Sequence, residues 1–245
     1  MRFFVSALLL ATLTVAVSAQ GRSLVMTVPV HESAGWRDRP EARAIAEMLR
    51  GTSGRERRWM RRPHLVVVTS VLAFQEGAHA GFAAVDAALT PDEARQLAAN
   101  MTEGLTVLSG GAFTRFASVR YEQVVPGRVV RVVRPGEIVA GRFRGVREAL
   151  EAVGYGGRTA RADGTITSGT VMLDEDYDRD DERHRLLRIH ELGHALGYNH
   201  VASERSVMNP TIGAEPTPFD RRVARIAFAH LMSPRGTPNL LARAR

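Results

Sequence analysis

Three histidines and one glutamate form a pattern that could bind a metal ion and use it in catalysis. The stretch from residue 190 to residue 200 reads His-Glu-Leu-Gly-His-Ala-Leu-Gly-Tyr-Asn-His. On a helix, His190 and His194 lie four residues apart and therefore share one face. Two neutral imidazoles in this arrangement can hold one Zn²⁺. Glu191 follows the first of them and can take a proton from a water molecule on the metal.

A third ligand follows if the helix ends shortly after the second histidine. Gly197 gives it a place to end, because glycine adopts a left-handed backbone at little cost. The chain can then turn and bring His200 to the metal. Three protein ligands leave a fourth position for water, as in a catalytic rather than a structural zinc site. Packing in the core is a weaker explanation, because it gives no reason for Glu191: carboxylates are rarely buried unpaired.

The extended pattern H-E-x-x-H-x-x-G-x-x-H resembles that of the metzincin metallopeptidases, and within them the chain is most similar to the matrixins. A second motif agrees with the first. Residues 206–210, Ser-Val-Met-Asn-Pro, resemble the Met-turn, whose methionine forms an apolar floor under the zinc. Met208 stands at a matrixin-like spacing after the third histidine. The resemblance is firm over residues 171–233 and weak before them.

The resemblance implies an activity and a set of roles. A matrixin-like protein hydrolyses peptide bonds with one catalytic zinc ion. Glu191 would be the catalytic base, and Gly197 and Met208 would support the site. The implied zinc ligands are His190, His194 and His200.

Two positions depart from the family patterns. Val201 stands directly after the third histidine, where matrixins usually have serine, and this leaves the metzincin subfamily open. Pro210 stands two residues after Met208, where astacins and serralysins carry a tyrosine ligand. A five-coordinate site of that kind is therefore not expected.

The implied fold is α+β: a metzincin-like (zincin) domain with a twisted, mostly parallel mixed sheet backed by a long helix, then the active-site helix, the Met-turn and a C-terminal helix. Local patterns agree. The β-branched run from His64 to Leu72 predicts a buried strand. Thr90-Pro91-Asp92-Glu93 forms a capping box that predicts the start of the long helix. Asp163-Gly164 predicts a hairpin turn, and Pro218 the start of a last helix, to about Met232.

Other segments give predictions that depend on weaker patterns. Residues 119–125 and 129–133 are predicted to be strands joined by a turn. In matrixin-like proteins the strand before the active helix pairs with substrate, and residues 157–162 could fill that role. The basic stretch 55–62 is expected to be a solvated helix packed through Trp59 and Met60; the alternative is a pro-segment with paired-arginine cleavage sites.

The acidic run from Asp174 to Asp181 has two explanations. Carboxylate oxygens suit Ca²⁺, so a calcium loop is one of them. However, the spacing matches no calcium motif. Acidic residues also favour the positive end of the helix that follows, predicted from about Asp181 to Leu196, and this second explanation accounts for the run without a metal.

The composition excludes several classes of function. The 245 residues carry a formal charge of +7, and all 33 basic residues are arginines. The arginines are spread along the chain without a nucleic-acid-binding motif, so no nucleic-acid partner is expected; the bias is typical of a GC-rich bacterial genome. There is no cysteine, which excludes disulfides, thiolate ligands and the cysteine that keeps many animal matrixins latent.

The N-terminus is typical of exported proteins. Arg2 precedes an apolar run from Phe3 to Val17, which is too short for a comfortable membrane span. Residues 1–19 therefore predict a signal peptide cleaved near Ala19, and a secreted or periplasmic protein with no membrane span in the mature chain. An uncleaved anchor is the alternative. The remaining predicted organisation is an N-terminal extension or pro-segment (20–63), the metallopeptidase domain (64–233) and a mobile tail (234–245).

These observations predict a secreted, monomeric zinc metalloendopeptidase that acts on peptide or protein substrates. Two alternatives stay open. One is a catalytically silent or highly restricted secreted zinc-binding protein with the same fold, against which the intact Glu191 argues. The other is a hydrolase of non-peptide bonds.

Overall fold

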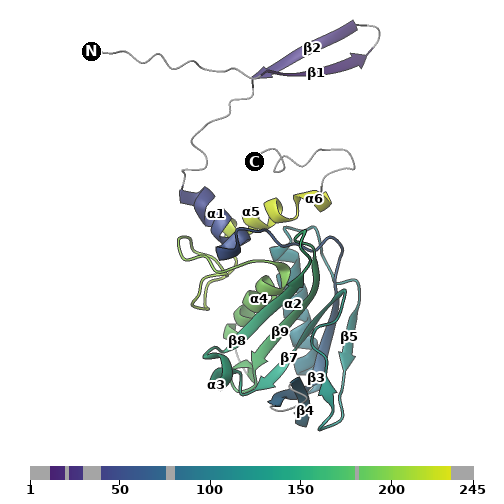
Figure 1. The fold of residues 1–245 in the computed structure, drawn as a ribbon, viewed down its shortest axis with the longest axis vertical. Helices are drawn as coiled ribbons and strands as arrows, with labels where there is room; N and C mark the ends of the chain where they lie inside the picture. The colour runs from purple at the N-terminus through teal and green to yellow at the C-terminus, as the bar shows by residue number, and fades with distance from the viewer. Residues whose placement is uncertain (1–11, 20–21, 30–39, 76–80, 180–181, 233–245) are drawn as a thin grey trace, which may run out of the picture. The chain divides into compact units, whose positions relative to one another are not determined.

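The computed structural model describes residues 12–19, 22–29, 40–75, 81–179 and 182–232 (Figure 1). Residues 1–11 of the predicted signal peptide and the predicted tail 234–245 lie outside these residues. The chain divides into two compact units, one ending at Ala42 and the other beginning at Arg43.

The first unit contains a pair of strands. Strand β1 (Thr12–Ala19) runs antiparallel to β2 (Arg22–Pro29), with Ala19 opposite Arg22. Among the described residues, no helix is long and apolar enough to cross a membrane.

The second unit is built on a mixed sheet, which over the described residues has seven strands. They are β3 (His64–Gln75), β4 (Gly81–Ala88), β5 (Val119–Glu122), β6 (Val129–Val130), β7 (Glu137–Arg144), β8 (Gly154–Ala160) and β9 (Ile166–Asp174). The order is β6-β4-β3-β7-β9-β8, and β5 also pairs with β3. Strands β3, β7 and β9 are parallel, whereas β4 and β8 join them antiparallel. This confirms the predicted α+β fold with a mixed sheet.

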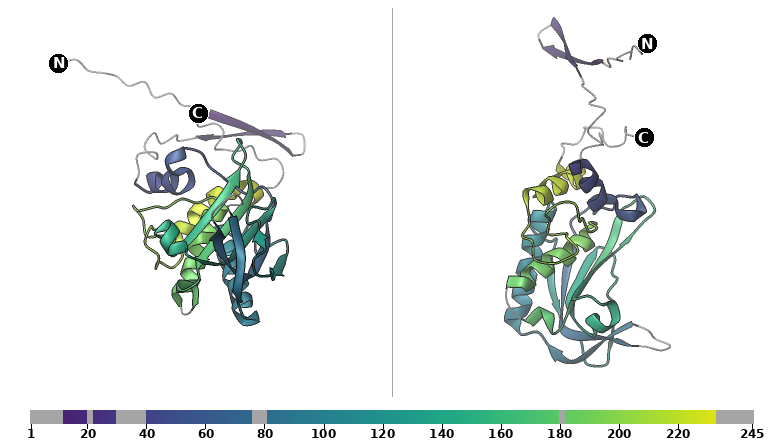
Figure 2. Two further views of the ribbon diagram at one scale, coloured as in Figure 1. Left: turned by 60° about the horizontal axis from the view of Figure 1, so that its bottom comes forward. Right: turned by 90° about the vertical axis from the view of Figure 1, so that its left-hand side faces the viewer.

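The central strands are buried on both faces. Along β3, Leu65 and Val67 belong to one apolar cluster, and Val66 and Val68 belong to another. This alternation follows from the two-residue period of a strand. The first cluster also contains the apolar faces of α2 (Pro91–Leu108) and α4 (Glu182–Leu196), which lie on the same face of the sheet (Figures 1 and 2).

Helix α2 begins as the sequence predicts. The hydroxyl of Thr90 accepts a hydrogen bond from the Glu93 amide at 3.2 Å, and the Glu93 carboxylate accepts one from the Thr90 amide at 2.7 Å. The predicted inner face is buried, including Leu97, Met101 and Leu105. The helix packs closely on α4 at Gly104, where an added Cβ would lie 3.0 Å from the Leu192 side chain. Helix α2 is thus the long helix that backs the sheet.

Shorter helices complete the unit. They are α1 (Pro40–Arg50), which belongs to this unit from Arg43 onward, η1 (Gly51–Ser53), α3 (Val146–Leu150), η2 (Tyr177–Arg179), α5 (Pro218–Ala227) and α6 (Ala229–Met232). The last predicted helix is therefore two helices, which meet at Phe228. The hairpin predicted around Asp163-Gly164 is confirmed by the antiparallel pairing of β8 with β9.

One local prediction is wrong. Residues 55–62 are not a helix: the backbone of Arg58 pairs with Gly164 and Ile166 at 3.0 and 2.9 Å, Trp59 is buried, and Met60 is 44% exposed. The predicted strands 119–125 and 129–133 are present as the shorter β5 and β6, with a turn between them, and they pair with β3 and β4 respectively.

The described part of the acidic run contacts arginines and backbone amides. Asp178 is fully buried between Arg142 and Arg188, with nitrogen–oxygen distances of 2.8–2.9 Å. Arg144 forms an ion pair with Glu175 at 2.9 Å. The contacts of Asp178 join β7, η2 and α4, and together these ion pairs give Asp178 and Glu175 a structural role.

Candidate metal and catalytic site

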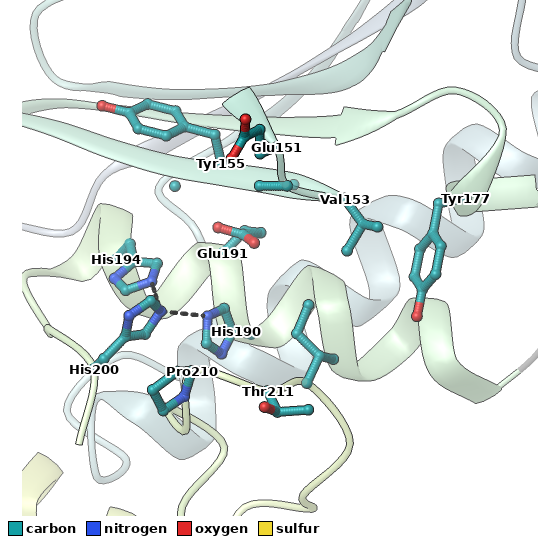
Figure 3. Close-up of a pocket in the computed structure, with 14 residues that line it drawn as sticks. Glu151, Val153, Tyr155, Tyr177, His190, Glu191, His194, His200, Pro210 and Thr211 are labelled. Carbon is teal, nitrogen blue, oxygen red and sulfur yellow. Dashed lines mark hydrogen bonds between the residues drawn. The ribbon is translucent and has the colours of Figure 1, made fainter. Parts of the chain in front are cut away.

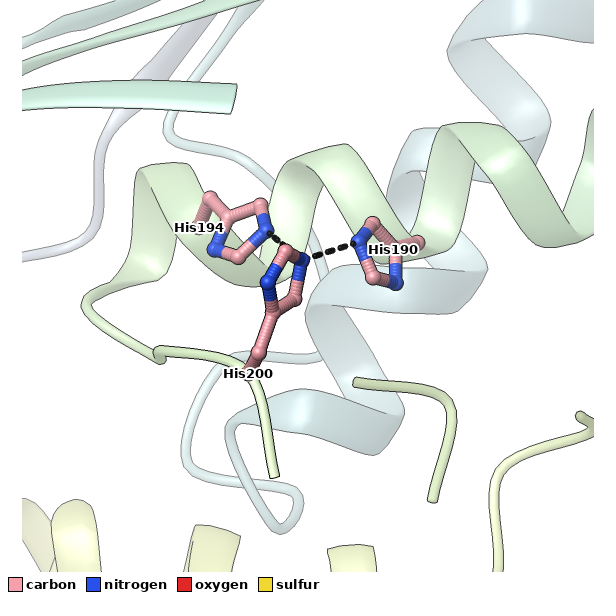
Figure 4. A group of neighbouring side chains, drawn as sticks. All are labelled: His190, His194 and His200. Carbon is pink, nitrogen blue, oxygen red and sulfur yellow. Dashed lines mark hydrogen bonds between the residues drawn. The ribbon is translucent and has the colours of Figure 1, made fainter. Parts of the chain in front are cut away.

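Helix α4 and the loop after it bring three imidazoles together (Figure 4). The Nε2 atom of His200 lies 3.2 Å from Nε2 of His190 and 3.1 Å from Nε2 of His194. Among the described residues, these three histidines are the one group of metal-ligating side chains close enough to share an ion. The structure therefore brings together the three histidines that the sequence proposes as ligands.

The backbone orients two of these rings. The Nδ1–H of His190 donates to the carbonyl of Val207 at 2.7 Å, and the Nδ1–H of His194 donates to the carbonyl of Tyr198 at 3.0 Å. This tautomer leaves each Nε2 unprotonated and pointed at the shared position, as is usual for metal-binding histidines. Burial lowers the pKa of His190 to about 4 and of His194 to about 3, so both rings are neutral at neutral pH.

The three donors fit Zn²⁺. Neutral imidazole nitrogens are common zinc ligands, and three of them leave a position open, as catalytic sites do. The second-shell carbonyls and the low pKa values add to this fit, because zinc binds the deprotonated ring.

Gly197 ends helix α4 as predicted. Its φ of 122° lies in the region that favours glycine, and its amide donates to the carbonyl of His194 at 3.1 Å. A side chain here would also collide with the carbonyl of Arg57. The next residue, Tyr198, is buried and donates its hydroxyl to the carbonyl of Leu108 at 2.6 Å. The turn to the third histidine is therefore fixed to both α2 and the segment before β3.

Met208 lies beneath the active-site helix. It is fully buried, and its sulfur lies against Gly193, where an added Cβ would overlap it. The carbonyl of Met208 accepts a hydrogen bond from the Val201 amide at 3.0 Å. Asn209 donates to the carbonyls of Val201 and Glu204 at 2.7 and 2.8 Å. The Met-turn is thus tied to the loop that carries the third histidine.

A buried aspartate, not identified from the sequence, holds the Met-turn. The carboxylate of Asp220 accepts hydrogen bonds from the Ser206 hydroxyl, the Val207 amide (3.2 Å) and the Thr217 amide (2.7 Å). It therefore fixes the residue whose carbonyl orients His190. Thr217 and Asp220 form a capping box at the start of α5, and that local pattern could have drawn attention to the aspartate.

Glu191 lies between the histidines and β8, on the side away from Pro210 and Thr211 (Figure 3). It is 4% exposed, and burial raises the pKa of its carboxyl to about 8, while a hydrogen bond from the Gly156 backbone opposes this rise. Glycines make the close approach feasible. An added Cβ at Gly154 would lie 2.7 Å from the Glu191 carboxylate, and one at Gly156 would overlap the Glu191 carbonyl oxygen.

The site opens into a cavity of about 650 Å³. The start of β8 lines one wall, and residues 210–212 after the Met-turn line the other (Figure 3). Glu191 and the three histidines line the same cavity. A carboxyl with a pKa near neutrality beside three metal-ligand nitrogens is suited to proton transfer.

Arg158 is a second residue that sequence reasoning missed. It projects from β8 and donates to the carbonyls of His194 (2.9 Å) and Tyr198 (3.1 Å) and to the side chain of Asn199 (2.8 Å). Its positive charge thus lies at the C-terminal end of α4, where helix carbonyls lack partners. Burial, together with repulsion from Arg57, lowers the pKa of Arg158 to about 10.

A helix that carries two histidines, a third histidine after a glycine turn, a buried methionine turn and a mixed sheet define a metzincin-type domain of the α+β class. Comparison with known families is more specific. Residues 149–223, from α3 into α5, match the model of the matrixin family. The chain therefore has a matrixin-like catalytic domain, and the match supports a zinc metallopeptidase with zinc at the three histidines. A comparison with curated proteins found no match.

Proposed function

We propose that this protein is a secreted, monomeric zinc metalloendopeptidase. The observation that carries the proposal is the convergence of the three Nε2 atoms beside buried Glu191, in one cavity that is open to substrate. The matrixin match over the same residues supports the class of reaction. Export is supported by the sequence pattern of residues 1–19 alone.

The geometry of the site supports the following roles. Zinc, when bound by His190, His194 and His200, would polarise the scissile carbonyl and lower the pKa of water. Glu191 would accept a proton from the attacking water at its carboxylate and then donate it to the nitrogen of the leaving amine. Its burial beside the three histidines, in the same cavity, supports this role.

Substrate binding by strand addition is part of the proposal. Strand β8 is the last strand in the sheet order and lies next to the cavity. An extended peptide paired with this edge would place its backbone across the histidines. The main-chain pairing would bind many sequences, and the cavity would select a side chain.

Zinc content and peptide cleavage, measured on the purified full chain with and without a chelator, test the proposal. We expect about one zinc per chain and cleavage that the chelator abolishes. Glu191→Gln should keep the zinc and reduce cleavage by at least about a hundredfold, because only the base is lost. Full activity in this variant would refute the role of Glu191. Zinc without cleavage of a broad peptide library would favour the silent or highly restricted alternative, and a folded protein without zinc would contradict the whole proposal.

A further inference from the structure

We propose that residues 43–62 are a permanent part of the catalytic domain and position the third zinc ligand, His200. The sequence leaves this stretch open as an extension or as a pro-segment to be removed. The inference depends on the proposed function only in taking His200 as a zinc ligand. It concerns which part of the chain keeps that ligand in place.

Helix α1 holds the loop on both sides of His200. The carbonyl of Met48 accepts hydrogen bonds from the amide of Asn199 at 2.8 Å and from its side chain at 3.2 Å. The carboxylate of Glu47 accepts hydrogen bonds from the Ala202 amide at 3.2 Å and the Ser203 hydroxyl at 3.1 Å. The residue before the ligand and the two residues that follow Val201 are thus bound to successive positions of one helix.

The loop needs these partners. Residues 197–203 are neither helix nor strand, so their amides cannot be paired by regular secondary structure. His200 is the least buried of the three ligand histidines: His190 is buried, His194 is half-buried and His200 is exposed. Its position is therefore set mainly by the backbone on either side of it.

The helix is itself fixed. Ala44 and Met48 are fully buried and Leu49 nearly so, and all three belong to the apolar cluster that also contains the inner face of α4. Gly51 then lets the chain pass directly over the loop, since an added Cβ would lie 2.7 Å from the Asn199 side chain. The chain from Arg43 onward forms one compact unit with the sheet.

The rest of the stretch holds the end of α4. Trp59 is buried and donates its indole N–H to the carbonyl of Ala195 at 3.0 Å. The carbonyl of Arg57 lies where a side chain on Gly197 would be, and Arg58 pairs with the turn between β8 and β9. The stretch thus contacts the active-site helix, its terminal glycine and the third-ligand loop in turn.

The contacts of residues 43–62 also limit where the chain could be cut during activation. Cleavage at the arginine pairs in 55–62 would separate α1 from the domain and remove the partners of Asn199 and Ala202. We therefore expect any cleavage that accompanies activation to fall before Arg43. This conflicts with the pro-segment that the arginine pairs suggest.

A pair of core substitutions in the full chain tests the positioning role. Met48→Ala and Leu72→Ala each remove a large, fully buried side chain, but Leu72 belongs to the apolar cluster that lacks residues of α1 and α4. Both should lower the melting temperature, because both leave a cavity. Zinc affinity, measured by competition with a chromogenic chelator, should fall about tenfold in Met48→Ala and less than twofold in Leu72→Ala.

Two surface variants, Glu47→Ala and Asp86→Ala, test the same role even if Met48→Ala does not fold. Glu47→Ala should weaken zinc binding by about threefold to fivefold, since two hydrogen bonds to the loop are lost. Glu47→Gln, which keeps an accepting oxygen, should recover part of this loss. Asp86→Ala removes an exposed carboxylate from β4 and is the control, with unchanged zinc affinity.

The outcomes separate this proposal from the proposed function. If the parent chain binds no zinc, the proposed function fails and the comparison of affinities does not arise. If the parent binds zinc but Met48→Ala and Leu72→Ala, or Glu47→Ala and Asp86→Ala, have equal affinities, the positioning role is refuted. N-terminal sequencing of the active species gives an independent readout: a chain that is active and begins after residue 62 would also refute it.

Discussion

The two sides of helix α4 are built in different ways. On the side of the Met-turn, the side chains of Asp220 and Asn209 hold the turn by hydrogen bonds, and a carbonyl of that turn orients His190. On the side of β8, Gly154 and Gly156 have no side chains, and this lets the strand pack directly against the helix and over Glu191.

This contrast separates two tasks. The Met-turn supports the metal ligands, whereas the glycine strand encloses the base and leaves its own edge available for pairing. Defects on the two sides should therefore differ in kind. Those near the turn should affect zinc affinity first, and those in the strand should affect the environment of Glu191 first.

The largest effect is expected from Gly156→Ala. The new Cβ would overlap the backbone of Glu191, which cannot rotate away, so β8 must move off the helix. We expect the free energy of unfolding to fall by more than about 3 kcal/mol, which is the upper end of the usual cost of adding atoms to a packed core. Gly157→Ala, on the same strand, is the control, because its Cβ would meet only the half-exposed ring of Tyr155 and should cost less than about 1 kcal/mol. Urea unfolding measures both; equal losses would contradict the account of the strand.

Asp220→Asn tests the other side. The amide keeps the shape of the carboxylate but loses its charge and one accepting oxygen, so one of the donors from Ser206, Val207 and Thr217 is left without a partner. The expected loss is about 2–3 kcal/mol, as for a buried hydrogen bond to a charged group. Zinc affinity should also fall about tenfold, because the carbonyl that orients His190 is released. Isothermal titration with zinc would measure this, and an unchanged affinity would show that the turn supports folding alone.

The sequence predicted the parts of the site that are local. The ligand histidines, Glu191 and Gly197 stand in one short motif, and the helix that carries them has the expected bounds within one residue at its start. The capping box at Thr90 likewise needs only neighbours in the chain. Patterns of this kind are visible because helix geometry relates them directly to spacing.

The supports of the site could not be predicted in this way. Trp59 contacts Ala195 across 136 positions, and Arg158 reaches Asn199 across 41. A single sequence has no signal for such pairs. The same reason explains the wrong helix at 55–62: its charges suggested a wet helical surface, but its backbone pairs with the β8–β9 turn.

The third prediction uses pH to isolate Glu191 in the metal-free protein. Burial raises the pKa of Glu191 from 4.5 to about 8, so the folded state favours the protonated acid. Stability from this group is present below about pH 4.5 and is lost as pH rises towards 8. The histidines act in the other direction: burial lowers the pKa of His190 from 6.5 to about 4 and of His194 to about 3, so their effect is to reduce stability as pH falls through and below about 7. Burial also lowers the pKa of His200 and His230.

Comparison with Glu191→Gln isolates the contribution of Glu191, because the histidines contribute equally to the stability of both proteins. Between pH 6.5 and 8 we expect the metal-free parent to lose about 2 kcal/mol of stability relative to Glu191→Gln. Denaturant unfolding in the presence of a chelator measures both. If the stability of the parent and of the variant changes with pH in the same way, water reaches the carboxyl and the glycine strand does not enclose it.

The smallest effect is expected from Met208→Leu, which tests whether the floor beneath the ligands needs its sulfur or only its volume. Leucine is similar in volume but branched, so it should cost less than about 1.5 kcal/mol in stability. Met101→Leu in α2, at an equally buried position of the same apolar cluster, is the matched control. We expect zinc affinity to fall by less than about tenfold in Met208→Leu and to stay constant in Met101→Leu. A larger fall would show that the methionine shapes the site through its contact with Gly193, and equal affinities would assign the support of the ligands to the hydrogen bonds of Asp220 and Asn209 alone.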